Sequence, residues 1–197
     1  RKALAHGVLV RSAAVFEELS KVRAVAFDKT GTLTERDLSV LRVDTDGDAS
    51  PEEVLGCLRA LEDGTKHPVG QAVLRHAEQA DARPITLRDR ALVAGKGVRG
   101  TDAEGRTLLL GSAAWIASEG VAHAMSAEAG SRVRVVLARD GQVLARVFVG
   151  EVLRPEAKDA IDTLAKDGMT AFMLTGDGSS GASEAAEALG IEASSGL

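Results

Sequence analysis

Cysteine is nearly absent from this sequence, and histidine is sparse. Cys57 is the only cysteine among 197 residues, which excludes an internal disulfide and a cluster of thiolate metal ligands. The four histidines, His6, His67, His76 and His123, are scattered, so their spacing does not predict a metal site. A reducing, cytoplasmic location fits this composition.

Long apolar runs and blocks of one charge are also missing. The longest apolar runs, 133–138 and 143–150, fall far short of the roughly 20 residues of a membrane helix. Acidic and basic residues are interspersed at a net charge of -5, so nucleic acid and anionic lipid are poor partners. Because the chain starts at Arg1 without an initiator Met, we expect a piece of a longer protein. We expect this piece to be soluble and monomeric.

Both ends of the chain show the alternation of helix and strand that builds a parallel α/β sheet. Val22–Phe27 is a short apolar run that ends abruptly at Asp28, as a buried parallel strand does at its ligand-binding carboxyl end. The same alternation returns after Arg154. The other expected elements are helices at 13–19, 154–165 and 182–189 and a strand at 169–174.

The middle of the chain has a different pattern, typical of an antiparallel sheet with helices. Ser50 and Pro51 predict the start of a helix that runs to about Glu62, and a second helix is expected from His67–Pro68 to Ala80. Strand-like segments are predicted at 39–43, on both sides of the turn 101–105, and in a hairpin around 139–142. We therefore expect an α/β core at 1–36 and 150–197, interrupted by an inserted α+β domain at 37–149.

The heptapeptide DKTGTLT, residues 28–34, carries the strongest chemical signal. It places the Asp28 carboxylate at a strand end, followed by small hydroxyl residues and a glycine whose backbone N–H groups can face a phosphate. The pattern suits an aspartyl-phosphate nucleophile, and a plain acidic cap on a tight turn is the alternative. All seven positions match the signature of P-type ATPases, which this chain resembles.

The residue two positions after the nucleophile separates a pump from a phosphatase. In the wider haloacid dehalogenase-like class this residue is often an Asp that acts as general acid and base, whereas this chain has Thr30. Losing such a group typically costs about 10²- to 10⁴-fold in rate. A threonine here would therefore let a phosphoenzyme persist, as a pump requires.

A second strand end carries the sequence TGD. The resemblance implies that Thr175 contacts the transferred phosphate, although TGD alone is often a plain strand-to-helix turn. It also implies that Mg²⁺ is held by the Asp28 carboxylate and the Thr30 backbone carbonyl. The catalytic set implied is Asp28, Lys29, Thr30, Thr175, Gly176 and Asp177.

The inserted domain carries elements similar to the adenine-binding residues of the heavy-metal branch of these pumps. Glu62 lies five residues before His67-Pro68, a pair that by itself only indicates a helix start. Thr65-Lys66 stands where these pumps commonly have Ser-Glu. The resemblance implies that His67 orients the adenine rather than acting as an acid or base.

Glycines supply the rest of the implied nucleotide site. Residues 95–100 satisfy GxGxxG, but a hairpin follows where a dinucleotide-binding motif requires a helix, so the Rossmann reading is rejected. No GxxxxGK[ST] occurs, which excludes a P-loop. Ser112 replaces the usual Asn of a Gly-Asn pair and fits an N-cap equally well. The implied nucleotide-binding set is Glu62, His67, Gly95, Gly97, Val98, Gly111 and Ser112.

Together these motifs resemble the cytosolic part of a heavy-metal-translocating P-type ATPase. The resemblance implies an incomplete haloacid-dehalogenase-like Rossmannoid α/β core with an inserted α+β nucleotide-binding domain on an antiparallel sheet. It implies ATP and Mg²⁺ as ligands, the pump's own membrane and actuator domains as partners, and a place at the cytoplasmic face of the plasma membrane. Residues 151–157 resemble the segment where the chain re-enters the core and are given a structural role.

The resemblance also implies a lysine and a GDGxND segment that do not occur before Leu197. We therefore expect this piece to bind nucleotide without efficient autophosphorylation, because phosphoryl transfer depends on positioned charge. One alternative is a soluble phosphatase of the same core class with a cap domain. A non-catalytic nucleotide-binding module is the other.

Overall fold

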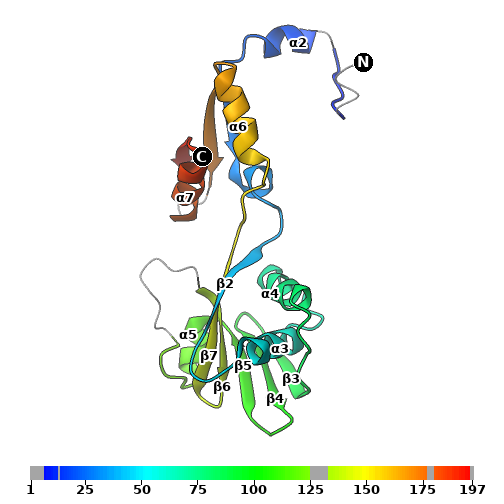
Figure 1. Ribbon diagram of the computed structural model, residues 1–197, viewed down its shortest axis with the longest axis vertical. Helices are drawn as coiled ribbons and strands as arrows, with labels where there is room; N and C mark the ends of the chain where they lie inside the picture. The colour runs from blue at the N-terminus through cyan, green and yellow to red at the C-terminus, as the bar shows by residue number, and fades with distance from the viewer. Residues whose placement is uncertain (1–6, 13, 125–132, 177–179, 196–197) are drawn as a thin grey trace. The chain divides into compact units, whose positions relative to one another are not determined.

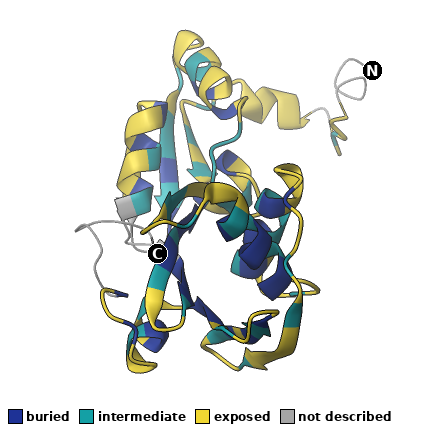
Figure 2. Ribbon diagram, turned by 60° about the horizontal axis from the view of Figure 1, so that its bottom comes forward, coloured by how far each residue is buried: buried dark blue, intermediate teal, exposed yellow. Residues whose placement is uncertain are grey.

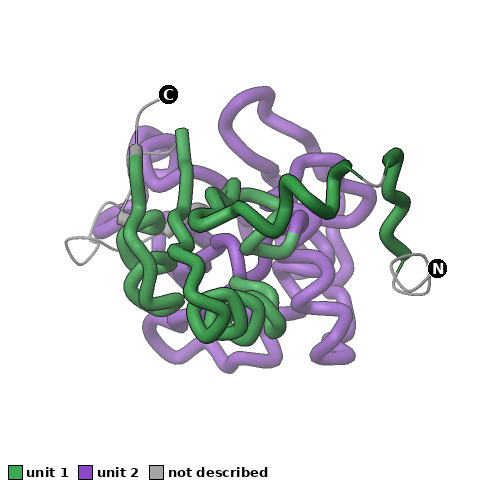
Figure 3. The backbone as a smooth tube through the Cα atoms, turned by 90° about the horizontal axis from the view of Figure 1, so that it is seen from above, with its two compact units in different colours: residues 1–35, 153–197 green, residues 36–152 purple. Residues whose placement is uncertain are grey.

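The computed structural model divides the chain into two compact units, and it describes residues 7–12, 14–124, 133–176 and 180–195. Unit 1 comprises residues 1–35 and 153–197, and unit 2 comprises residues 36–152 (Figure 3). The sequence analysis placed the boundaries after residues 36 and 149. Each unit is built around its own sheet.

Unit 1 is an α/β unit around a parallel sheet with the strand order β1-β8-β9 (Figure 1). Met173 is fully buried at its centre and packs with Ile161 and Leu189 from the two flanking helices. The predicted parallel α/β core is thereby confirmed. Its described elements are α2 (Ala14–Leu19), β1 (Ala24–Asp28), the turn η1 (Lys29–Leu33), α6 (Ala157–Lys166), β8 (Thr170–Thr175), α7 (Ser180–Leu189) and β9 (Glu192–Ser195).

Two features of unit 1 differ from the expectation. The strand before Asp28 was predicted to be buried, but Ala24 and Ala26 are exposed and Val25 and Phe27 only half-buried. The reason is that β1 is an edge strand of the described sheet and pairs there with β8 alone. Strand β9 was not predicted, because its four residues contain no apolar run.

Unit 2 is an antiparallel sheet in the order β2-β7-β6-β5-β4-β3, with helices packed on it. Alternate residues of β5 serve two different cores, as strand geometry requires. Leu108 and Leu110 pack with α3 and α4, whereas Leu109 packs with α5. Figure 2 shows the buried parts of the chain in dark blue. The elements are β2 (Ser39–Thr45), α3 (Pro51–Leu61), α4 (Pro68–Gln79), β3 (Leu87–Val93), β4 (Gly97–Asp102), β5 (Thr107–Gly111), α5 (Ala113–Ser118), β6 (Val133–Arg139) and β7 (Gln142–Gly150).

Local signals account for most of these boundaries. The Ser50 hydroxyl accepts a hydrogen bond from the Glu53 N–H at 3.1 Å, which confirms the predicted N-cap of α3. Asp140 and Gly141 turn the β6–β7 hairpin with φ of 47° and 80°, as its sequence predicted. The left-handed Gly95, at φ 70°, separates β3 from β4. Among the described helices, none has the length and apolar character that crossing a bilayer requires.

Candidate functional site

Asp28 and Thr175 lie at the same edge of the parallel sheet of unit 1. Asp28 is the last residue of β1 and pairs in register with Leu174, the residue directly before Thr175 at the end of β8. The Asp28 side chain is exposed, and Thr175 is 7% exposed. The carboxyl ends of parallel strands are where α/β sheets bind ligands. This edge therefore presents a carboxylate next to a strand that ends in a hydroxyl.

The turn after Asp28 is held in shape by Thr34. Its N–H donates to the Lys29 carbonyl at 3.1 Å, and its hydroxyl donates to the same carbonyl at 3.2 Å. The hydroxyl also accepts a hydrogen bond from the Gly31 N–H at 3.2 Å. Gly31 has φ 76°, which a residue with a side chain rarely adopts. The result is a compact loop on which Thr30 and Thr32 remain exposed.

Arg154 also holds this loop, a role that the sequence analysis missed. Its guanidinium donates to the Gly31 carbonyl at 3.3 Å, and its backbone N–H donates to the Leu33 carbonyl at 2.9 Å. Thr34 and Leu153 form an isolated antiparallel bridge beside it. The re-entering segment thus closes the 28–34 loop, and no local pattern could reveal a contact across 123 positions.

The other predicted catalytic residues, Lys29, Gly176 and Asp177, differ in how the structure places them. Lys29 is only 5% exposed. Gly176 follows β8 directly in a bend, and Asp177 lies outside the described residues.

The oxygen donors of this loop fit Mg²⁺. Asp28 and the Thr30 backbone offer a carboxylate and a carbonyl, which are hard oxygen ligands. The described part of the chain contains no group of three or more His, Cys, Asp or Glu side chains that could form an all-protein metal cage. Mg²⁺ is typically held by one or two carboxylates together with substrate phosphates, so this sparse donor set suits it.

Glu62 and His67 are linked within unit 2 through Thr65. Glu62 is the C-cap of α3, and His67 is the N-cap of α4. The Thr65 hydroxyl accepts a hydrogen bond from the His67 N–H at 3.3 Å and donates one to the Glu62 carboxylate. His67 is exposed, whereas Glu62 is only 7% exposed. The loop between the two helices therefore presents one imidazole to solvent, next to a carboxylate that is almost fully buried.

The burial of Glu62 raises its pKa, and its neighbours counteract this effect. The hydrogen bond from Thr65 and the positive charges of Arg90 and His67 each lower the pKa of the Glu62 carboxyl. Gly70 makes room for the carboxylate, because a Cβ there would lie 2.4 Å from Glu62 Oε2. The sequence analysis missed Gly70, although a glycine inside a helical pattern was an available signal.

Two of the three glycines of the predicted nucleotide site, Gly97 and Gly111, lie against Trp115, whereas Gly95 has open space around it. A Cβ at Gly97 would lie 2.6 Å from Trp115 Cζ3, and a Cβ at Gly111 would lie 2.4 Å from Trp115 Cε3. Ser112 caps α5 by accepting from the Trp115 N–H at 3.3 Å, as the N-cap alternative predicted. Val98 is 4% exposed and packs in the core with α3 and α4, which leaves only its backbone for contact with a nucleotide.

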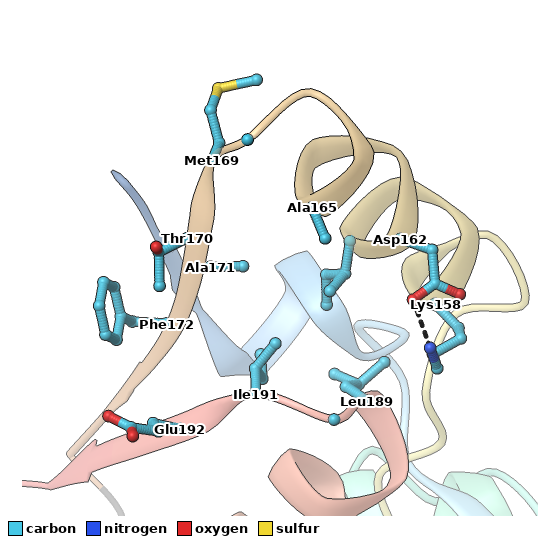
Figure 4. A pocket seen from close by; sticks show the side chains of 13 residues that line it. Lys158, Asp162, Ala165, Met169, Thr170, Ala171, Phe172, Leu189, Ile191 and Glu192 are labelled. Atoms are coloured by element: carbon cyan, nitrogen blue, oxygen red, sulfur yellow. Dashed lines mark hydrogen bonds and ion pairs between the residues drawn. The ribbon is translucent and has the colours of Figure 1, made fainter. Parts of the chain in front are cut away.

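The hollow drawn in Figure 4 lies apart from the predicted catalytic residues Asp28 and Thr175. It has a volume of about 710 Å³ and is lined by the amino ends of β8 and β9, whereas Asp28 lies at a carboxyl end. Ala171, Leu189 and Ile191 give it an apolar lining, and Lys158 pairs with Asp162 at its rim.

A family model of haloacid dehalogenase-like hydrolases matches residues 22–195, so the chain belongs to this family. Within that class, its relatives are heavy-metal P-type ATPases. A probable copper-transporting ATPase, SynA of Synechococcus elongatus, is 35% identical over 187 residues, which is 94% of this chain and 23% of the relative. The zinc/cadmium/lead-transporting P-type ATPase of Escherichia coli is 33% identical over 97% of this chain and 26% of the relative.

A solved structure supports the same assignment. A zinc-transporting PIB-type ATPase in its E2.Pi state has a TM-score of 0.87 and 31% sequence identity, covering 99% of this chain and 32% of that one. The chain thus spans about a quarter of the curated relatives it matches. The predicted fold and the predicted resemblance to heavy-metal P-type ATPases are confirmed.

Proposed function

We propose that this chain is the ATP-binding and aspartyl-phosphorylation region of a heavy-metal cation-transporting P-type ATPase. The observation that carries the proposal is the exposed Asp28 at the end of β1, in register with the residue before Thr175 on β8. One relative of the chain is a probable copper-transporting ATPase and another is a zinc/cadmium/lead-transporting ATPase, which supports a heavy-metal cation as the transported ion. Glu62 and His67 of unit 2 would hold the adenine.

In the proposed reaction, a carboxylate oxygen of Asp28 attacks the γ-phosphorus of ATP. An Asp28 oxygen–phosphorus bond forms, the bond from phosphorus to the bridging oxygen breaks, and ADP leaves with those electrons. The Thr175 hydroxyl and backbone N–H groups of the 28–34 loop would bind phosphoryl oxygens. Bound Mg²⁺, held by the Asp28 carboxylate and the Thr30 carbonyl, would supply positive charge against the phosphates. Thr30 has no acid/base group to speed hydrolysis of the acyl phosphate.

We further propose that the region acts at the cytoplasmic face of the plasma membrane, together with membrane and actuator domains of the same pump. ATP hydrolysis there would drive metal export. The 197 residues alone would bind ATP and transfer phosphate slowly, because the sequence offers no GDGxND segment to bring a second acidic residue to the phosphate.

Calorimetric titration of ATP with Mg²⁺ into this chain tests the nucleotide site. We expect saturable binding that His67→Ala weakens about tenfold, the effect of losing roughly one net hydrogen bond. His76→Ala is the matched control, because His76 lies near the other end of α4. Absence of binding, or equal loss in both variants, would contradict the proposed nucleotide site.

A second measurement addresses the chemistry. Transfer of label from γ-labelled ATP should give an acid-stable, hydroxylamine-sensitive product that Asp28→Asn abolishes, while Asp37→Asn, at an exposed position past the loop, retains it. Turnover of small phosphate esters without a trapped intermediate would favour the phosphatase alternative instead.

A further inference from the structure

Strand β3 contains a bulge directly beside the proposed adenine site. Arg88 pairs with Thr101 and Ala91 pairs with Arg99, so two residues of β3 oppose Gly100 alone. The first of these two, Asp89, has a left-handed backbone with φ 50°. Such a conformation is uncommon for a residue with a side chain, and bulges commonly redirect a side chain away from the regular strand pattern.

The redirected side chain is that of Arg90, which binds the end of α3. Its Nε donates to the Leu61 carbonyl at 2.8 Å, and its Nη2 donates to the Asp63 carbonyl at 2.5 Å. These carbonyls belong to the residues on either side of Glu62. The guanidinium thereby fixes the backbone of the residue before and the residue after the predicted adenine ligand, with two donors held in one rigid plane.

The carboxylate of Glu62 has several other restraints. It accepts from the Thr65 hydroxyl and lies where Gly70 lacks a side chain. The charged groups that act on it are Arg90 of β3 and His67 at the start of α4. Burial raises the pKa of Glu62, and the charge of Arg90 opposes that effect. Removing this charge would let Glu62 take up a proton at a higher pH.

We propose that Arg90 is a positioning residue for nucleotide binding, which holds Glu62 in place and ionised so that its carboxylate can accept a hydrogen bond from the adenine amino group. This inference rests on the proposed function of unit 2. Arg90 does not itself touch the nucleotide; it acts through Glu62. A role limited to capping the carbonyls of α3 is the alternative, and it predicts a loss of stability without any effect on the pH dependence of binding.

The test is the affinity for ATP with Mg²⁺, measured by calorimetry between pH 5 and pH 8. We expect Arg90→Met to weaken binding about tenfold at pH 7. Its affinity should also begin to fall at a higher pH than that of the wild type, because Glu62 then protonates more readily. Arg88→Met, at an exposed position on the same strand, should follow the wild-type curve.

Two further variants distinguish the possible roles. Arg90→Lys keeps the charge but loses the planar pair of donors, so it should bind severalfold more weakly with an unshifted pH profile. If Arg90→Met fails to fold, the affinity of Arg90→Lys is the measurement that tests the proposal. In a Glu62→Gln background, Arg90→Met should no longer shift the profile, because the group on which the charge acts is gone.

Each opposite outcome has a separate meaning. If wild type binds ATP and both Arg90 variants bind as wild type does, the positioning role is wrong while the proposed function stands. A pH shift that persists in the Glu62→Gln background would also overturn the role. If the wild-type chain binds no ATP at any pH, the proposed function fails and the role of Arg90 fails with it.

Discussion

Gly97 and Gly111 lie directly opposite each other on β4 and β5, and the indole of Trp115 fills the space where both side chains would stand. The Trp115 Nε1–H donates to Glu119 at 2.9 Å, and Arg99 binds the other oxygen of the same carboxylate at 2.8 Å. The Glu119 carboxylate that fixes the indole N–H is therefore itself held at both oxygens. The absence of side chains at 97 and 111 has a packing reason, independent of any nucleotide.

Gly97→Ala should destabilise unit 2 by about 1–3 kcal/mol, because the added methyl group overlaps the Leu110 carbonyl and the Trp115 ring. Gly100→Ala on the same strand is the control. The nearest atoms to its new methyl lie at 3.5 Å, so its effect should stay within about 0.5 kcal/mol. Urea denaturation followed by the emission of Trp115, the only tryptophan of the chain, measures both. Equal stabilities would contradict the packing argument.

Thr34→Val should loosen the 28–34 loop. The change keeps the shape of a side chain that is 2% exposed but removes its bonds to the Gly31 N–H and the Lys29 carbonyl. An unpaired buried group costs about 1–3 kcal/mol, so amide exchange at Gly31 should speed up at least about tenfold. Thr32→Val, on the exposed side of the same loop, should leave that exchange rate unchanged. Hydrogen exchange followed by NMR gives both rates.

Asp102→Ala should destabilise the β4–β5 hairpin by about 1–3 kcal/mol. The Asp102 carboxylate is 4% exposed and accepts from the backbone N–H groups of Glu104 and Arg106 at 3.1 and 2.8 Å. Burial raises its pKa, but these bonds and the Arg106 side chain outweigh that effect and hold the pKa below its usual value. The ionised Asp102 carboxylate therefore stabilises the hairpin above about pH 4, and this contribution is lost as the pH falls further.

Glu104→Ala is the matched control for this prediction. Glu104 pairs with the same arginine but is 64% exposed, and exposed ion pairs contribute about 0–1 kcal/mol. Denaturant titrations at pH 7 compare the two variants. If Glu104→Ala loses as much free energy of unfolding as Asp102→Ala, the hydrogen bonds of Asp102 are not what stabilises the hairpin.

Cys57 should make unit 2 less stable as the pH rises above 9. Burial raises the pKa of its thiol from 9.0 to about 11, with a smaller opposing effect from Arg139. Because the unfolded chain then loses the proton first, this contribution is present below pH 9 and lost between pH 9 and 11, by at most about 3 kcal/mol. The denaturation midpoint of wild type should fall more steeply over that range than the midpoint of Cys57→Ala. Parallel curves would contradict the prediction. The chain contains no tyrosine, whose titration would overlap this window.

The sequence alone determined the features that depend on near neighbours. Ser50 capping α3 and Asp140-Gly141 turning a hairpin each involve groups within four residues, where composition and backbone preference are decisive. The strand that ends at Asp28 is such a feature too, because a short apolar run followed by a carboxylate is visible in one line of sequence. The class of fold followed from these signals, and the prediction of a nucleophile at Asp28 rests on them.

Only the tertiary structure decided how the sites are supported. Arg154 reaches Gly31 across 123 positions, and Arg90 reaches Leu61 across 29. The burial of Lys29 and Val98, and the fit of Trp115 against two glycines, depend on which elements pack together. Periodicity shows which face of an element turns inward but not which partner it meets, because that choice is made by the packing of the whole core.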